Sequence, residues 1–182
     1  SIVSSCFILV RERATGDNEV IAMADCAINI NPTEDELVDI ALEAAECAKT
    51  FGIDPKIAFL SYSTHGSGKG EDVDKMKNAF EKARVKAPDI PMEGELQFDA
   101  AVAPRVARSK CPDSTVAGHA NTFIFPDINA GNIGYKIAQR LGGFDAYGPI
   151  LLGLNAPIND LSRGCNASEV YSMAIVTAAL AD

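Results

Sequence analysis

The sequence predicts a single α/β domain built on a largely parallel sheet. Short apolar segments rich in β-branched residues alternate with amphipathic helical segments along most of the chain. A length of 182 residues is ordinary for one domain, and no linker or internal repeat divides it. The composition is 47% hydrophobic and 23% charged, as in globular proteins, so the chain has enough apolar residues for a core.

The chain begins with two expected strands and a helix. Apolar runs at 2–10 and 20–30 flank a turn signal at 16–18, which predicts a hairpin with a long loop. Thr33 is then expected to cap a helix, and Glu36 completes a capping box. Gly52 stands where a glycine commonly ends a helix. Between them the apolar residues follow helical spacing: Leu37, Ile40, Ala41, Ala44, Cys47, Ala48 and Phe51.

The remaining elements continue the alternation. Strands are expected at 56–62, 96–98, 121–125 and 150–154, and helices at 72–86, 99–109 (interrupted at Pro104), 129–141 and 167–180. In open α/β sheets the ligand site lies beyond the carboxyl ends of the strands. The loops at 62–68, 126–132 and 155–165 each follow an expected strand, so we expect them to meet at one edge of the sheet.

Charge and cysteine content limit the possible partners. A net charge of -9 argues against binding to nucleic acid or to an anionic membrane, although a locally basic cleft could still take a small polyanion. No run of about 18 apolar residues predicts a membrane span, and no basic segment opens a signal peptide. The 5 cysteines show no metal-ligand spacing. We therefore expect a cytoplasmic protein with reduced thiols and no metal; the missing initiator Met suggests that Ser1 is an internal cut.

Ser162 and Arg163 are the strongest local candidates for catalysis. They stand in a turn before an expected helix, where backbone N–H groups favour anions. The arginine fork matches phosphate oxygens in two-point geometry. The alternative is structural: Ser162 caps a turn and Arg163 pairs with Asp160 at the surface.

Glu169 is the candidate proton acceptor, one helical turn further on. It could take the proton of a thiol, but ordinary pKa values make that transfer uphill by roughly 6 kcal/mol. Burial of the acid or an arginine beside the thiolate would have to reduce this cost. The alternative is that Asn166 caps the helix and Glu169 completes a capping box.

Two further loops carry candidate substrate-binding residues. The first loop could hold an anion on backbone N–H groups, or could be an ordinary connection; its candidates are Ser63, Thr64, Gly66 and Ser67. In the second loop Asp127 and Asn132 could orient substrate. Asn129 is also a candidate there, although a role as helix N-cap explains it structurally.

Nearly the whole chain resembles the second half of the phosphate acetyltransferase (phosphotransacetylase) family. The matching segments, in order, are 23–27 with 31–33, 61–64 with 66–67, 94–100, 116–121, 125–135 and 148–165. The resemblance implies a three-layer fold like that of isocitrate and isopropylmalate dehydrogenases, a homodimer and a cleft between two domains. It makes residues 1–182 the C-terminal domain of a two-domain acyltransferase, because family members are close to twice this long. The isolated chain is therefore expected to fold but to be weakly active or inactive.

The resemblance also implies a reaction and roles. Acetyl-CoA and phosphate would be interconverted with CoA and acetyl phosphate by direct attack of the CoA thiolate, with CoA as substrate and no tightly bound cofactor. Ser162 would stabilise developing charge and Arg163 would hold acetyl phosphate. Glu169 stands where the family usually has an aspartate base, which is a departure from the pattern. Cys165 receives no role.

Three alternatives stay open from the sequence. Phosphate butyryltransferase and the acetyltransferase of ethanolamine-utilisation compartments differ in acyl substrate or setting. A non-catalytic domain that senses acetyl-CoA is a different class, although such a sensor would have no need of Ser162 and Arg163. A dinucleotide-dependent dehydrogenase is disfavoured, because the glycine fingerprint is missing.

Overall fold

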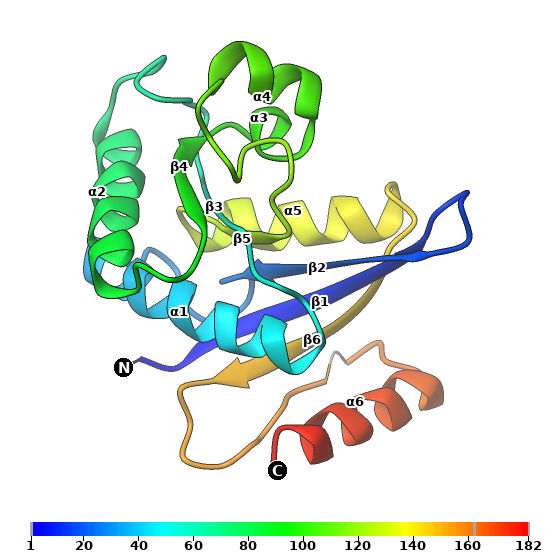
Figure 1. Ribbon diagram of the computed structural model, residues 1–182. Helices are drawn as coiled ribbons and strands as arrows, with labels where there is room; N and C mark the ends of the chain where they lie inside the picture. The colour runs from blue at the N-terminus through cyan, green and yellow to red at the C-terminus, as the bar shows by residue number, and fades with distance from the viewer. Residues whose placement is uncertain (1, 162, 182) are drawn as a thin grey trace.

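The computed structural model describes residues 2–161 and 163–181 and centres on a six-stranded sheet (Figure 1). The strand order is β4-β3-β5-β2-β1-β6. β1 runs antiparallel to both of its neighbours, and the other described pairs are parallel, which confirms a largely parallel α/β sheet. The strands are β1 (Ser4–Glu12), β2 (Asn18–Ala24), β3 (Ile57–Leu60), β4 (Met92–Leu96), β5 (Thr122–Ile124) and β6 (Asp145–Leu152).

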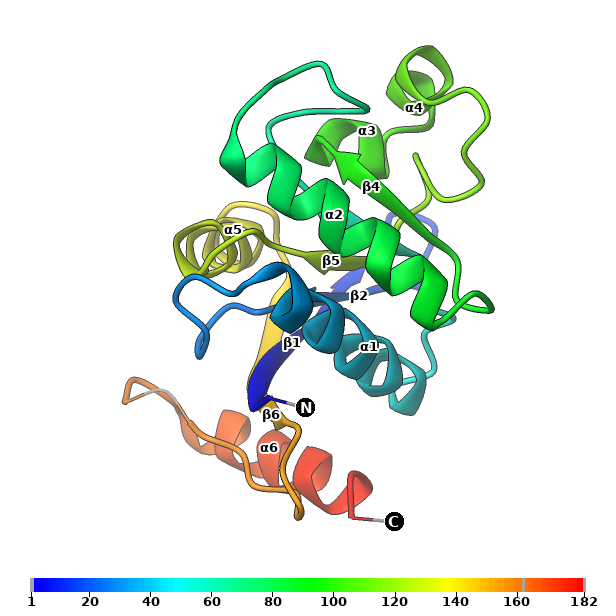
Figure 2. The same cartoon turned by 90° about the vertical axis from the view of Figure 1, so that its left-hand side faces the viewer.

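Helices cover both faces of the sheet, which gives three layers. Figure 2 shows α1 and α2 together on one side and α5 on the other. α6 lies beyond β6, the edge strand, in both views (Figures 1 and 2). The helices are α1 (Glu34–Thr50), α2 (Glu71–Lys86), α3 (Phe98–Val102), α4 (Pro104–Lys110), α5 (Ile128–Arg140) and α6 (Ala167–Ala179).

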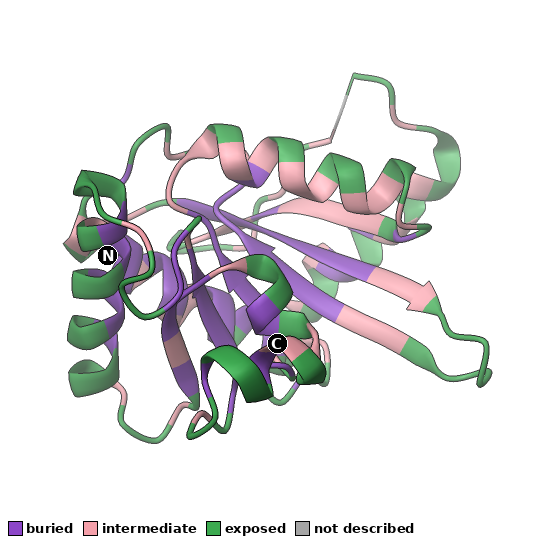
Figure 3. Ribbon diagram, turned by 90° about the horizontal axis from the view of Figure 1, so that it is seen from above, coloured by how far each residue is buried: buried purple, intermediate pink, exposed green. Residues whose placement is uncertain are grey.

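Two apolar cores lie on the two faces of the sheet. One joins the strands to α1, α2 and α6, and the other joins them to α3, α4 and α5. Alternate residues of one strand serve different cores: Cys6 and Ile8 of β1 belong to the first, Phe7 and Leu9 to the second. Figure 3 shows the buried residues gathered in the strands and on the helix faces turned toward them. Among the described residues no helix is long and apolar enough to span a membrane.

The N-terminal predictions are largely confirmed. β1 and β2 form the expected hairpin, and Thr33 and Glu36 form the expected capping box of α1. β2, however, ends at Ala24 rather than continuing to residue 30. The reason is Asp25, whose buried carboxylate accepts the backbone N–H groups of Ala27, Ile28 and Asn29 and thereby folds the chain into a turn.

Two strands were predicted with the wrong limits. β4 spans 92–96 rather than 96–98, because its edge position tolerates the half-buried Glu93, and the Gly66 N–H donates to the buried Glu95 carboxylate. β6 begins at residue 145 rather than 150. The Gly148-Pro149 pair is typical of a turn, but it fits here because β6 is an edge strand with an irregular register against β1.

Candidate functional site

Two cavities open on nearly opposite faces of α5. Ala130, Gly134, Ile137 and Ala138 line the first, whereas Tyr135, Lys136, Gln139 and Arg140 line the second. Their volumes are about 550 and about 280 Å³. The helix is therefore a wall shared by both cavities.

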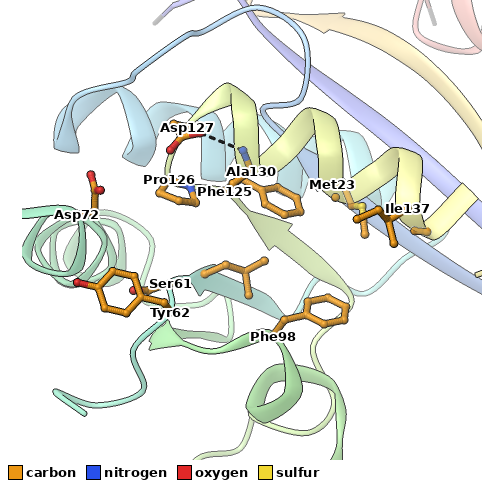
Figure 4. A pocket seen from close by; sticks show the side chains of 13 residues that line it. Met23, Ser61, Tyr62, Asp72, Phe98, Phe125, Pro126, Asp127, Ala130 and Ile137 are labelled. Carbon is orange, nitrogen blue, oxygen red and sulfur yellow. Dashed lines mark hydrogen bonds between the residues drawn. The ribbon is translucent and has the colours of Figure 1, made fainter. Parts of the chain in front are cut away.

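The first cavity brings together two of the three predicted loops (Figure 4). Tyr62 follows β3, and Pro126 and Asp127 follow β5. Most of the other lining side chains are apolar, among them Met23, Leu60, Phe98 and Phe125. The loops at 62–68 and 126–132 thus meet at the carboxyl edge of the sheet, as the strand order requires.

The third predicted loop lines the second cavity. The segment leading into α6 contributes Leu161, Gly164, Cys165, Glu169 and Met173; the rest of the lining is Phe7, Ala146, Tyr147, Gly148 and Pro149 together with the α5 residues named above. The prediction that all three loops share one site is therefore met only for the first two, because α5 stands between them and the third.

Two cations mark the second cavity. Lys136 and Arg140 stand one helical turn apart on α5, and Glu169 is the one acidic residue in the described lining. Like charges at this spacing repel each other and destabilise an isolated helix. The pair is therefore better explained by binding of an anionic ligand than by stabilisation of α5. The cavity is thus locally basic in a chain of net charge -9.

An aromatic pair forms one wall of the same cavity. The rings of Phe7 and Tyr135 stack with centroids 4.0 Å apart, and the Lys136 ammonium lies 5.8 Å from the Tyr135 ring. Burial raises the pKa of the Tyr135 hydroxyl above its ordinary value. The tyrosine therefore stays neutral over the physiological range and presents an apolar ring beside the two cations.

Arg163 is exposed and lies next to the second cavity through its neighbour Gly164, which lines it. No ion pair joins Arg163 to Asp160, both of which the structure describes, so the predicted surface pair is not formed. Ser162 lies outside the described residues. The structure thus places residue 163 beside this cavity in the chain, with its side chain exposed and not held in the foreseen surface ion pair.

Glu169 fulfils the structural role foreseen for it. Its carboxylate accepts the Asn166 backbone N–H at 2.8 Å, and its own N–H donates to the Asn166 side chain at 3.0 Å, which completes the capping box of α6. The same residue also lines the second cavity. The Glu169 side chain therefore both caps α6 and forms part of the cavity wall.

The loop after β3 uses its polar groups within the protein. The Gly66 N–H donates to the buried Glu95 carboxylate at 3.2 Å. The N–H groups of Thr64 and Gly68 donate to the hydroxyls of Ser67 and Ser63, at 3.0 and 2.9 Å. An anion does occupy this loop, as the pattern of small residues predicts, but it is the protein's own carboxylate.

The three candidates at the start of α5 have different positions. Asp127, not Asn129, is the N-cap, and its carboxylate accepts the Ala130 N–H at 3.0 Å. As an N-cap, Asn129 was placed two residues too late, because the helix already begins at Ile128; its side chain is exposed. Asn132 donates to the Cys26 carbonyl at 3.0 Å and so ties α5 to the turn after β2.

Sequence reasoning missed the cavity-lining role of four residues: Lys136, Gln139, Arg140 and Tyr147. Lys136 and Arg140 could have been found from one signal: they are cations at i and i+4 on a helix that carries no acidic residue. Tyr147 had no comparable signal, because its place follows from the pairing of β6 with β1. No group of three potential metal ligands occurs within residues 2–161 and 163–181.

Comparisons with known proteins agree on one family. A family model described as phosphate acetyl/butaryl transferase matches residues 1–178. The phosphate acetyltransferase of Bacillus subtilis (strain 168) is 54% identical over 98% of this chain and 54% of its own length. A phosphotransacetylase structure from Streptococcus pyogenes superposes with a TM-score of 0.95 at 59% identity, over 100% of this chain and 54% of that one. The EutD phosphotransacetylase from Staphylococcus aureus gives a TM-score of 0.92 at 49% identity, over 100% and 55%. The chain thus spans about half the length of these relatives.

Proposed function

Because the chain belongs to the phosphate acetyl/butaryl transferase family, we propose that its full-length gene product interconverts acetyl-CoA and phosphate with CoA and acetyl phosphate. The observation that carries this proposal is the second cavity, where Lys136 and Arg140 face the segment that follows Arg163. A thiol nucleotide with several phosphates is the kind of ligand that two cations beside an aromatic wall would hold.

The reaction proceeds by direct attack of the CoA thiolate on the acetyl carbonyl, with phosphate as leaving group. Arg163 holds the phosphate of acetyl phosphate, and Ser162 donates to the developing negative charge. No covalent intermediate on the protein is needed, so Cys165 is a wall residue.

Glu169 accepts the thiol proton in this scheme. The Asn166 N–H already donates to this carboxylate at 2.8 Å, and transfer of a proton from a free thiol to a free carboxylate is uphill by roughly 6 kcal/mol. Stabilisation of the thiolate by Lys136, Arg140 or Arg163 therefore has to supply much of the driving force. The proton transfer and the grip on CoA depend on the same cations.

The chain's substrates are CoA, acetyl phosphate and inorganic phosphate, with no tightly bound cofactor and no nucleic-acid or membrane partner. The setting is cytoplasmic acetate metabolism. The acetyl group is the preferred acyl group, in keeping with the names of the relatives; rates with acetyl, propionyl and butyryl phosphate would test this. The isolated 182-residue chain is expected to be weakly active at best, because family members enclose the substrate with more chain than this.

Arg163→Ala in the full-length gene product is expected to lower kcat/KM for acetyl phosphate by about 100-fold. Loss of a charge-assisted, two-point contact to phosphate costs roughly 3 kcal/mol, which corresponds to this factor. The measurement is the rate of acetyl-CoA formation from acetyl phosphate and CoA.

The matched control is Arg108→Ala, which removes an exposed arginine of α4 that lines neither cavity. This control should keep the rate of the unchanged protein. Equal rates for both variants would refute the proposed function and would favour the acetyl-CoA-sensing domain instead.

We also infer that two copies pair through α5. Ile133, Ile137 and Leu141 form an apolar ridge with 57%, 53% and 85% of their surface exposed. The ridge adjoins the apolar first cavity, which Ile137 itself lines (Figure 4). A ridge beside a groove on one surface is self-complementary, as a two-fold interface requires.

Ile137→Glu is expected to convert the dimer of the full-length gene product into monomers, because a charge would be buried in the apolar contact. Light scattering after size-exclusion chromatography measures the mass. Val85→Glu is the control, since Val85 is an exposed apolar residue of α2 on the other side of the sheet. A dimer that survives Ile137→Glu would place the interface elsewhere.

A further inference from the structure

One side chain joins the strand before the Ser162-Arg163 segment to the helix after it. That side chain is Asn159, which is half-buried and lies midway between the end of β6 and the start of α6. It lies outside both cavities and touches no group assigned to substrate above.

Asn159 makes contacts in two directions. Its side-chain oxygen accepts the Leu151 N–H of β6 at 2.9 Å, and its side-chain nitrogen donates to the Thr177 hydroxyl of α6 at 2.8 Å. The Thr177 hydroxyl in turn donates to the Met173 carbonyl at 2.7 Å. A backbone bridge between Ile150 and Asn159 adds a further link to β6.

The chemistry of the amide explains why asparagine suits this place. The β6 edge offers an N–H donor, whereas the Thr177 hydroxyl, which has already donated its proton, offers a lone pair. One short side chain with an acceptor and a donor at the same end satisfies both groups. Leucine, of similar size, would satisfy neither.

The chain on either side of Asn159 is fixed at both ends, so the contacts of Asn159 determine the position of the segment between them. At the start of the segment, Gly153 has a φ of 76°, and a Cβ there would lie 2.0 Å from the Ile2 carbonyl oxygen, so the chain can leave β6 in this direction only with glycine. At the other end the Asn166 and Glu169 capping box fixes the entry into α6. Asn159 is the anchor between these two fixed ends.

We propose that Asn159 is a positioning residue for acyl transfer. This proposal rests on the function proposed above. By fastening the chain to β6 and to α6 at once, it sets where Arg163 stands relative to Lys136 and Arg140 across the second cavity. A displacement of about 1 Å at such a site lowers rates by on the order of 100-fold.

The test uses Asn159→Leu, Asn159→Asp and the double variant Asn159→Asp with Thr177→Val in the full-length gene product. Asn159→Leu is expected to lower kcat by about 100-fold while the KM for CoA stays within about twofold, because Lys136 and Arg140 still bind CoA. Asn159→Asp is expected to keep kcat within about tenfold, since the Thr177 hydroxyl can turn to donate to the carboxylate. The double variant should lose this rescue.

Asn155→Leu is the matched control, because Asn155 is an exposed asparagine of the same segment that lines neither cavity. Hydrogen exchange at the Leu151 amide is a second readout and should accelerate in Asn159→Leu but not in Asn155→Leu. If Asn159→Leu does not fold, the aspartate variants still decide the question.

The outcomes separate the two proposals. Unchanged kcat in the Asn159 variants, with Arg163→Ala inactive, overturns the positioning role and leaves the function intact. A lower melting temperature with normal kcat in Asn159→Leu means a purely structural residue and also overturns it. If Arg163→Ala retains turnover, the proposed function is refuted. Hydrogen exchange at the Leu151 amide would then still show whether Asn159 anchors the segment.

Discussion

Gly131→Ala is expected to lower the free energy of unfolding by about 2–3 kcal/mol, although alanine favours helices over glycine. A Cβ at this position would lie 2.3 Å from the Asp25 backbone oxygen, far inside van der Waals contact. Asp25 cannot yield, because three backbone N–H groups hold its carboxylate in the turn after β2. The helix must therefore move away, and the Asn132 bond to the Cys26 carbonyl would be lost with it.

Urea denaturation followed by circular dichroism measures this loss of stability. Gly134→Ala is the matched control on the same helix, with the same gain in helix propensity. Its Cβ would meet the edge of the Phe125 ring at 3.0 Å, and this ring borders the first cavity, into which it can shift. The control should change the stability by less than about 1 kcal/mol. Equal effects of the two variants would show that the close approach to Asp25 does not determine the position of α5.

Removal of both cavity cations, in the double variant Lys136→Ala and Arg140→Ala, is expected to weaken CoA binding by about 1,000-fold. Each charge-assisted hydrogen bond to a phosphate contributes roughly 2 kcal/mol, so two of them correspond to about this factor. Calorimetric titration of CoA into the full-length gene product gives the dissociation constant. Added salt should weaken binding to the unchanged protein more than to the variant, since screening acts on the charges that the variant lacks.

The control removes two positive charges elsewhere. Arg105→Ala and Arg108→Ala together change the net charge of the chain equally, but both arginines are exposed on α4 and line neither cavity. Comparable weakening in this control would mean that CoA responds to the overall field and not to the second cavity. The site would then have to be sought elsewhere on the protein.

Two helix starts that depend on contacts between residues close in the sequence were predicted correctly. The capping boxes of Thr33 with Glu36 and of Asn166 with Glu169 are short-range hydrogen bonds, and both helices begin where expected. The limits of β4 and β6 were wrong, because polar and turn-forming residues are tolerated at the sheet edges, and edge position is a property of the assembled sheet.

The candidate site was predictable only in part. Ser162, Arg163 and Glu169 stood out because unusual residue types occur close together in the sequence. Lys136 and Arg140 come from an element more than 20 residues earlier, so only the fold could bring them opposite Glu169. The Ser63 loop shows the converse: its composition predicted anion binding, but the Glu95 carboxylate that binds there comes from the neighbouring strand.

The double exposure of α5 has a thermodynamic consequence. In the proposed scheme its ridge would meet a second copy and its opposite face would hold CoA, so any restraint that one contact placed on the helix would alter the free energy of the other. Such a linkage is reciprocal: CoA would tighten self-association by the same factor by which self-association tightens CoA. Affinities measured in dilute and in concentrated solution would then differ, and the size of the difference would report how rigidly this one helix couples its two faces.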